Sequence, residues 1–188
     1  MDANVQARPM THSWLGAAQA RPIVAAAVVI AGLGSATILG AWFFQYLGYK
    51  PCPLCLEQRY VYYFGIPLAV LILLGDGVGS SRKVLVAALF AIAAGMLWNT
   101  YLSTYHAGIE WKWWPGPPDC SGTLDHITAP GSILDSIKPV RCDEAAWRFL
   151  GISLAGYDAL ISQTLAVVAG WGAWAGWNQA RSNHQASS

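Results

Sequence analysis

Four long apolar stretches limit what this chain can fold into. They run over about 22–47, 56–75, 84–105 and 151–177, and each is long enough to cross a membrane, which takes about 20 apolar residues. The fourth stretch contains a single charge, Asp158. Each stretch must be helical in lipid, because the membrane interior offers no other hydrogen-bond partners for the backbone. The pattern predicts an all-α membrane protein built as a four-transmembrane-helix bundle.

The composition favours a membrane protein over a soluble globule. Hydrophobic residues make up 55% of the chain and charged residues only 11%, whereas soluble domains average about 25% charged residues. The formal net charge of +1 argues against nucleic acid as a partner. Arg8 and Arg21 precede the first stretch as they would in a signal peptide, but its apolar run exceeds the roughly 7–15 residues of a signal sequence. We therefore expect a retained span.

An even number of spans places both termini on one side of the membrane. That side holds 1–21, 76–83 and 178–188, and the opposite side holds the loops at about 48–55 and 106–150. Lysine and arginine are nearly balanced between the sides, so the positive-inside rule decides little. All four cysteines lie in the two loops, and cysteines pair in oxidising compartments. We therefore expect cytoplasmic termini and periplasmic cysteine loops.

The second outer loop is the only sizeable polar region within the membrane domain, which is expected to span 22–177. Its segment 132–137 has apolar residues at helical spacing. This spacing predicts a short amphipathic helix lying horizontally on the membrane surface.

Cys52 and Cys55 form a CxxC motif at the expected start of the second helix, and Pro53 suits a first helical turn because its missing N–H costs nothing there. The positive end of a helix lowers the pKa of a thiol. Arg59 follows Cys55 by one turn on the same face, where it would stabilise a Cys55 thiolate or an anionic acceptor. These features indicate a redox site, and the structural alternative is a stapled turn with an interfacial arginine.

Cys120 and Cys142 form a second candidate pair in the outer loop. A disulfide between them would close roughly 20 residues and stabilise the loop by roughly 3 kcal/mol. A structural staple is therefore one interpretation, and exchange between two exposed, neighbouring disulfides is the other. Zinc binding by the cysteines with His106 or His126 is a third possibility, but the second pair lacks CxxC spacing, and no metal site is predicted.

Two ionisable residues near the outer ends of the spans are ambiguous. His106 ends the third stretch, where it would either bond the backbone at the interface or donate a proton to a reducible ring, since its pKa lies near ambient pH. Asp158 lies roughly two turns into the fourth stretch, and intramembrane acids are functional candidates. Hydration near the outer end also explains Asp158, so it is not assigned to the site.

Three motifs together resemble the disulfide bond formation protein B (DsbB) family, over about 22–177. They are Pro51-Cys52-Pro53-Leu54-Cys55 with Gln58-Arg59, similar to that family's first outer loop; Tyr105-His106-Ala107-Gly108-Ile109-Glu110, similar to its third-span exit; and Cys142 with Trp147-Arg148-Phe149-Leu150-Gly151-Ile152-Ser153, similar to its entry to span four. Asp158 departs from the uncharged polar residue expected there, which leaves the fold prediction untouched.

The resemblance implies a four-helix fold with a horizontal helix in the second periplasmic loop, in the bacterial inner membrane. It implies a thiol:quinone oxidoreductase that reoxidises a DsbA-like periplasmic thiol oxidase and passes the electrons to ubiquinone or menaquinone from the membrane pool, which sustains protein disulfide formation. Arg59 and His106 would hold the quinone ring. The catalytic residues would be Cys52, Cys55, Cys120 and Cys142.

The implied relay has three steps. The partner's thiolate attacks the Cys120–Cys142 disulfide at Cys120, and the freed Cys142 then attacks the Cys52–Cys55 disulfide. Cys55 finally passes two electrons to the quinone.

Two rival hypotheses remain. A quinone reductase like the vitamin K epoxide reductase family also uses CxxC in a four-helix bundle, but its quinone-proximal CxxC lies late in the chain. A non-catalytic membrane scaffold would use the disulfides only to hold its outer loop. The scaffold predicts that replacing Cys55 weakens folding and leaves disulfide formation intact.

Overall fold

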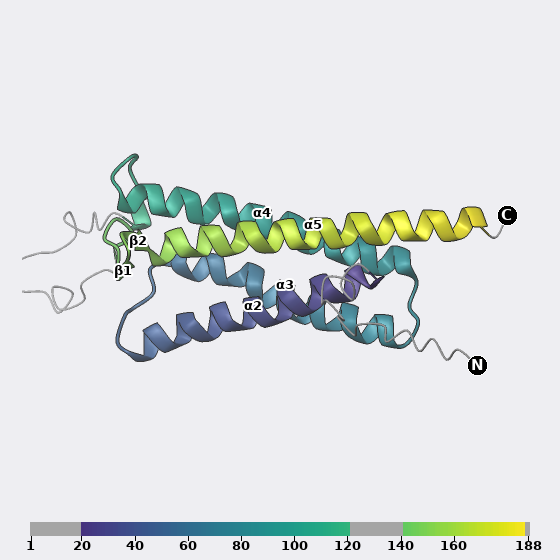
Figure 1. Ribbon diagram of the computed structural model, residues 1–188. Coiled ribbons are helices and arrows are strands. Elements are labelled where there is room, and N and C mark those ends of the chain that lie inside the picture. The colour runs from purple at the N-terminus through teal and green to yellow at the C-terminus, as the bar shows by residue number, and fades with distance from the viewer. Residues whose placement is uncertain (1–19, 121–140, 187–188) are drawn as a thin grey trace, which may run out of the picture.

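A computed structural model of the protein describes residues 20–120 and 141–186. Four long helices dominate the described residues and run up and down beside one another (Figure 1). A short 3-10 helix and a two-stranded antiparallel hairpin lie between the last two helices, at one end of the bundle. The elements are α2 (Pro22–Tyr46), α3 (Pro53–Gly77), α4 (Arg82–Glu110), η1 (Pro118–Cys120), β1 (Arg148–Phe149), β2 (Ile152–Ser153) and α5 (Leu154–Ala186). The chain is mainly helical, in agreement with the predicted fold class.

Three of the described helices, α2, α3 and α4, are long and apolar enough to cross a membrane. The fourth helix, α5, is the longest at 33 residues but is not among these candidates, because glycine, tryptophan and polar side chains lower its hydropathy. The structure thus supports a multi-pass helical membrane protein, and the fourth span stays a prediction.

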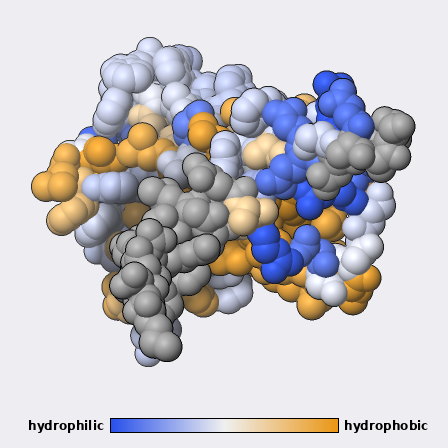
Figure 2. Space-filling model, turned by 45° about the vertical axis from the view of Figure 1, so that its right-hand side comes forward, coloured by the Kyte–Doolittle hydropathy of each residue, from blue (hydrophilic) through white to orange (hydrophobic). Residues whose placement is uncertain are grey.

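The outer faces of the helices carry many large apolar side chains. The face in Figure 2 shows broad hydrophobic areas, with strongly hydrophilic residues gathered on one side. A soluble monomer rarely exposes such extensive apolar patches, whereas lipid solvates them. The more exposed of these side chains include Leu39, Phe43, Phe64, Leu74, Phe90, Trp98, Leu160, Val167 and Trp174.

The core between the helices is built from small and branched apolar residues, which let the backbones approach closely. Ala26, Ile30 and Leu89 are fully buried. A Cβ atom added at Gly172 of α5 would lie 2.5 Å from the Cβ of Ala26 on α2, so only glycine permits this approach. Small residues at helix contacts are the usual means of association in membranes, where burial from water cannot drive packing.

Several helix boundaries differ from the predicted spans, because capping and helical hydrogen bonds, rather than apolarity, set the end of a helix. α3 begins at Pro53 instead of 56, with Pro53 in the first turn as predicted and Cys52 as the N-cap. α4 continues to Glu110, past the predicted end at 105. α5 runs over Leu154–Ala186 instead of 151–177, so most of the predicted tail at 178–188 is helical. The predicted horizontal helix at 132–137 lies outside the described residues, as does nearly all of the segment 1–21.

Candidate active site

Both cysteine pairs lie at the same end of the bundle, in one packed cluster. A disulfide joins Cys120, at the end of η1, to Cys142. Both cysteines pack with Cys52, Leu54 and Ile109 in a buried apolar cluster. The structure therefore brings the two pairs together, although they lie on separate loops. The expectation that the Cys120–Cys142 pair is exposed is wrong, since each of its residues is only 1% exposed.

The CxxC pair occupies the first turn of α3. The sulfur atoms of Cys52 and Cys55 lie 2.7 Å apart as free thiols, and the Cys55 backbone N–H donates to the Cys52 sulfur across 3.2 Å. Cys52 is buried against the second cysteine pair, whereas Cys55 is half-buried and faces a cavity. The two thiols thus face different surroundings, Cys52 the second cysteine pair and Cys55 the cavity.

His106 lies behind Cys52 on α4. Its Nε2 atom is 3.6 Å from the Cys52 sulfur, and its Nδ1 atom accepts a hydrogen bond from Gln58 Nε2 at 3.1 Å. The Gln58 contact leaves the ring proton on Nε2, directed at the Cys52 sulfur. Hydrogen bonds from Cys55 and then His106 lower the pKa of the Cys52 thiol to about 5, against the opposing effect of burial. The structure thus stabilises the thiolate of Cys52, where the sequence had pointed to Cys55.

We expect the Cys52 thiolate to titrate near pH 5 in the fully reduced protein, followed by thiolate ultraviolet absorbance. The thiolate persists above this pH and is lost below it. His106→Ala should move the midpoint upward, because the imidazole lowers this pKa. A Cys52→Ala variant identifies the transition by losing it. A wild-type midpoint near the roughly 8.5 of a free cysteine would contradict this assignment.

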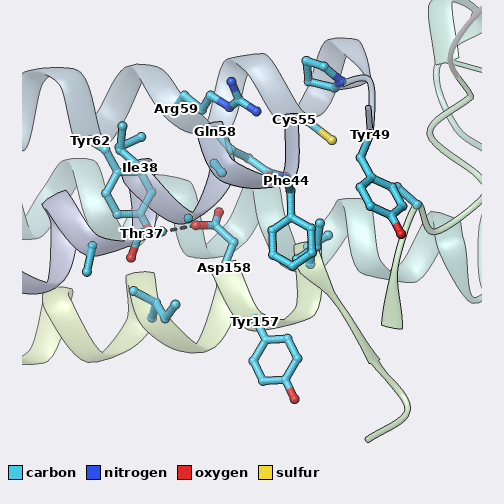
Figure 3. A pocket seen from close by; sticks show the side chains of 18 of the residues that line it. Thr37, Ile38, Phe44, Tyr49, Cys55, Gln58, Arg59, Tyr62, Tyr157 and Asp158 are labelled. Carbon is cyan, nitrogen blue, oxygen red and sulfur yellow. Dashed lines mark hydrogen bonds between the residues drawn. The ribbon is translucent and has the colours of Figure 1, made fainter. Parts of the chain in front are cut away.

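A cavity of about 270 Å³ opens between α2, α3 and α5 beside Cys55 (Figure 3). The α2 wall is mainly apolar and includes Ile38 and Phe44, while α3 contributes Cys55 and Arg59. Arg59 Nη1 donates to Gln45 Oε1 at 2.8 Å. Arg59 thus lines the same cavity as Cys55, and the hydrogen bond it makes is to Gln45.

The two residues expected to hold a quinone ring occupy different places. Arg59 lines the cavity, whereas His106 is buried behind Cys52 and is not among the lining residues. Gln58 connects the two regions, because it lines the cavity and hydrogen bonds His106.

The structure also brings in polar residues that sequence analysis left out of the site. Glu110 is buried with its Oε1 atom 3.9 Å from His106 Nε2, and its Oε2 atom has no hydrogen-bond partner among the described residues. The sequence does contain a sign of this contact, because Glu110 follows His106 by four residues and residues so spaced on a helix are neighbours. Tyr62 and Asp158 line the cavity together. No spacing rule joins these two, because they lie on helices far apart in sequence.

Cys52, Cys55 and His106 also gather as possible metal ligands, with their donor atoms within 4.8 Å of one another. Cys120 and Cys142 are joined to each other in a disulfide. The four-cysteine zinc site considered from the sequence is therefore not formed in the described structure.

Comparison with known proteins decides the family. The family model described as "Disulfide bond formation protein DsbB" matches residues 23–172, most of the chain. The chain belongs to the DsbB family. Among curated proteins named disulfide bond formation protein B, those from Stutzerimonas stutzeri (strain A1501) and Azoarcus sp. (strain BH72) are 30% and 26% identical to this chain over 154 and 160 residues. These alignments cover 76% and 80% of this chain, and 90% of each relative.

A third relative, from Psychrobacter sp. (strain PRwf-1), is 29% identical over 131 residues, which cover 66% of this chain and 74% of the relative. No solved structure matches the chain significantly. Membership of the DsbB family and the apolar helices make the protein a membrane oxidoreductase of disulfide bond formation.

Proposed function

We propose that this protein is a thiol:quinone oxidoreductase that reoxidises a DsbA-like periplasmic thiol oxidase and delivers the electrons to ubiquinone or menaquinone. The observation that carries this proposal is the placement of the CxxC pair. Cys52 packs against the Cys120–Cys142 disulfide, and Cys55 lines a largely apolar cavity. One thiol pair therefore touches both a second disulfide and a space suited to a lipid-soluble ring.

The geometry supports a direction for thiol exchange. The freed Cys142 thiolate attacks Cys52, because Cys52 is the CxxC residue in its packed cluster, and Cys55 is the leaving thiolate. The Cys120 thiolate then attacks Cys142, which re-forms the Cys120–Cys142 disulfide and releases the Cys52 thiolate, the form favoured by its lowered pKa. As Cys52 and Cys55 re-form their disulfide, their two electrons would pass to a ring held in the cavity beside Cys55.

The cavity has the chemistry that a quinone head group requires. Apolar side chains of α2 fit a flat ring, and Arg59 can donate a charge-assisted hydrogen bond to a ring oxygen. His106 acts on Cys52 rather than on the ring, because it lies outside the cavity wall. Two electrons and two protons convert a bound quinone into a quinol.

The proposed topology follows the oxidising chemistry. α5 is the fourth span, the termini are cytoplasmic, and both cysteine pairs face the periplasm across the bacterial inner membrane. Both pairs share one end of the bundle, while α2 begins and α5 ends at the other (Figure 1). A periplasmic partner can reach only the cysteine end in this orientation.

The deciding experiment mixes purified protein with a reduced DsbA-like oxidase and follows quinone absorbance. We expect one quinone reduced per dithiol oxidised. Arg59→Ala should raise the quinone KM by roughly tenfold, the effect of losing one hydrogen bond to a charged group, with kcat largely kept.

Arg82→Ala is the matched control for this assay, because Arg82 donates to Gln179 Oε1 at 2.7 Å in the same type of contact, near the other end of the bundle. The KM of this variant should equal that of wild type. Folded wild-type protein that reduces neither ubiquinone nor menaquinone would refute the proposal, and an unchanged KM in Arg59→Ala would remove Arg59 from the quinone site.

A further inference from the structure

A buried polar cluster forms the inner wall of the cavity, and the disulfide relay makes no use of it. Asp158 of α5 is at its centre, and Tyr62 of α3 donates to Asp158 Oδ1 at 2.6 Å (Figure 3). Asn99 of α4 donates to Oδ2 at 3.0 Å, and Ser103 of α4 also donates to Oδ2. Three helices therefore converge on one carboxyl group at the cavity.

We infer that Asp158 is the proton-carrying group of the quinone site, an inference that rests on the proposed function. Burying a carboxyl group among helices is costly, so a group that serves only packing would be better replaced by an uncharged one. What a carboxyl group adds over an amide is the ability to take up and release a proton. Asp158 lines the same cavity as Cys55, where a quinone must acquire protons as it is reduced.

The cluster can satisfy Asp158 in both protonation states. Tyr62 Oη lies 2.6 Å from Asp158 Oδ1 and 3.0 Å from Ser162 Oγ. A hydroxyl group both donates and accepts, so Tyr62 donates to the ionised carboxylate and turns toward Ser162 when Asp158 is protonated. The Ser103 hydroxyl can turn in the same way. Loss or gain of a proton therefore requires only rotation of hydroxyl groups.

The polar cluster around Asp158 and the Cys55 thiol are far enough apart for a ring to fit between them. Cys55 and Tyr62 are seven residues apart on α3, which puts both on one helical face roughly 10 Å apart along the axis. A quinone ring held in this cavity would have Cys55 and Arg59 at one end of the wall and Tyr62 and Asp158 at the other. The polar cluster thus serves the oxygen that is farther from the thiols.

The proton balance closes over one turnover. Over one turnover the partner's dithiol loses two electrons and two protons, and a bound quinone would gain two of each to become a quinol. Asp158 gives one proton to the oxygen on its side of the cavity. It would be reprotonated from the protons that the partner's dithiol has released, so no outside reactant is needed.

Other charged groups around Asp158 and the cavity come from two helices and from the loop between α2 and α3, where Lys50 lines the cavity. Arg59 of α3 lines the cavity, and His106 of α4 interacts electrostatically with Asp158. Among the described residues, α2 contributes no ionisable side chain to the cavity wall. Asp158 is therefore the only carboxyl group among the described residues that line this cavity.

The test compares Asp158→Asn with Asp76→Asn, which makes the same chemical change where α3 ends and Asp76 pairs with Arg21. Asparagine at 158 should be tolerated, because Asn99 Oδ1 has no partner in the described structure and can accept the new amide after a flip. We expect Asp158→Asn to lower kcat for quinone reduction by roughly 10²-fold, the lower range for a general acid. Quinone KM and single-turnover thiol exchange with the partner should stay unchanged, and Asp76→Asn should match wild type.

Infrared difference spectroscopy during one quinone reduction gives a readout that does not depend on turnover or on the folding of Asp158→Asn. Wild type should show loss and recovery of a carboxylic acid band, and Tyr62→Phe should shift this band because Tyr62 bonds the carboxyl. A kcat within twofold of wild type in Asp158→Asn, or no carboxyl band in wild type, would overturn the inference about Asp158 and leave the proposed function standing. Wild type that reduces no quinone would instead refute the proposed function.

Discussion

Cys55→Ala is expected to abolish sustained quinone reduction, with a loss of roughly 10³-fold or more, because Cys55 is the thiol that faces the quinone cavity. The variant should still oxidise one equivalent of reduced partner, since the Cys120–Cys142 disulfide remains. A single stoichiometric burst followed by arrest is therefore the expected time course. Quantifying partner thiols and quinone absorbance in the same sample measures both phases.

The scaffold hypothesis gives the opposite result for this variant. If the cysteines only hold the outer loop, Cys55→Ala would alter thermal stability and leave cellular disulfide formation intact. The redox proposal predicts normal membrane levels, a stability change of roughly 1 kcal/mol as for an average substitution, and a partner that accumulates reduced. Sustained quinone loss in this variant would exclude Cys55 as the electron donor.

The helices of the fold could be predicted from the sequence, because long apolar stretches correspond to them. Long uncharged stretches revealed the helices, since lipid leaves a backbone few alternatives. The helix ends were less predictable, because an N-cap contact at Cys52 and continued helical bonding to Glu110 determine them. Hydropathy alone also leaves α5 short of the candidate spans.

The site was predictable where its residues follow one another in sequence. CxxC and Arg59 share one face of α3, and the spacing alone indicates this. The packing of Cys52 against the second pair, and the convergence of Asp158 with Tyr62 and Asn99, depend on contacts between helices. Such contacts leave no periodic signal in a single sequence, which is why the sequence alone does not assign Asp158 to the site.

Cys142→Ala should stop quinone turnover by roughly 10³-fold and also trap the partner. The proposed relay passes through Cys142, so without the Cys142 thiol the proposed exchange with Cys52 in the packed cluster is lost. The remaining Cys120 thiol attacks the disulfide of an oxidised partner and forms a mixed disulfide, with one partner thiolate as the leaving group. Without Cys142, only that partner thiolate can break the mixed disulfide. A non-reducing gel should show one band at the combined mass, which reductant abolishes.

Measuring Cys120→Ala beside Cys142→Ala separates the loss of stability from the trapping of the partner. Both variants lose the same disulfide, which closes a separation of 22 residues and contributes about 3 kcal/mol on the chain-entropy model, so both should be destabilised alike. Only Cys142→Ala should accumulate the mixed disulfide if the partner engages Cys120. A stronger mixed disulfide in Cys120→Ala would reverse the order of attack. Because both cysteines are buried, the partner must first open their cluster, and trapping should therefore be faster in mild denaturant that leaves the helices folded.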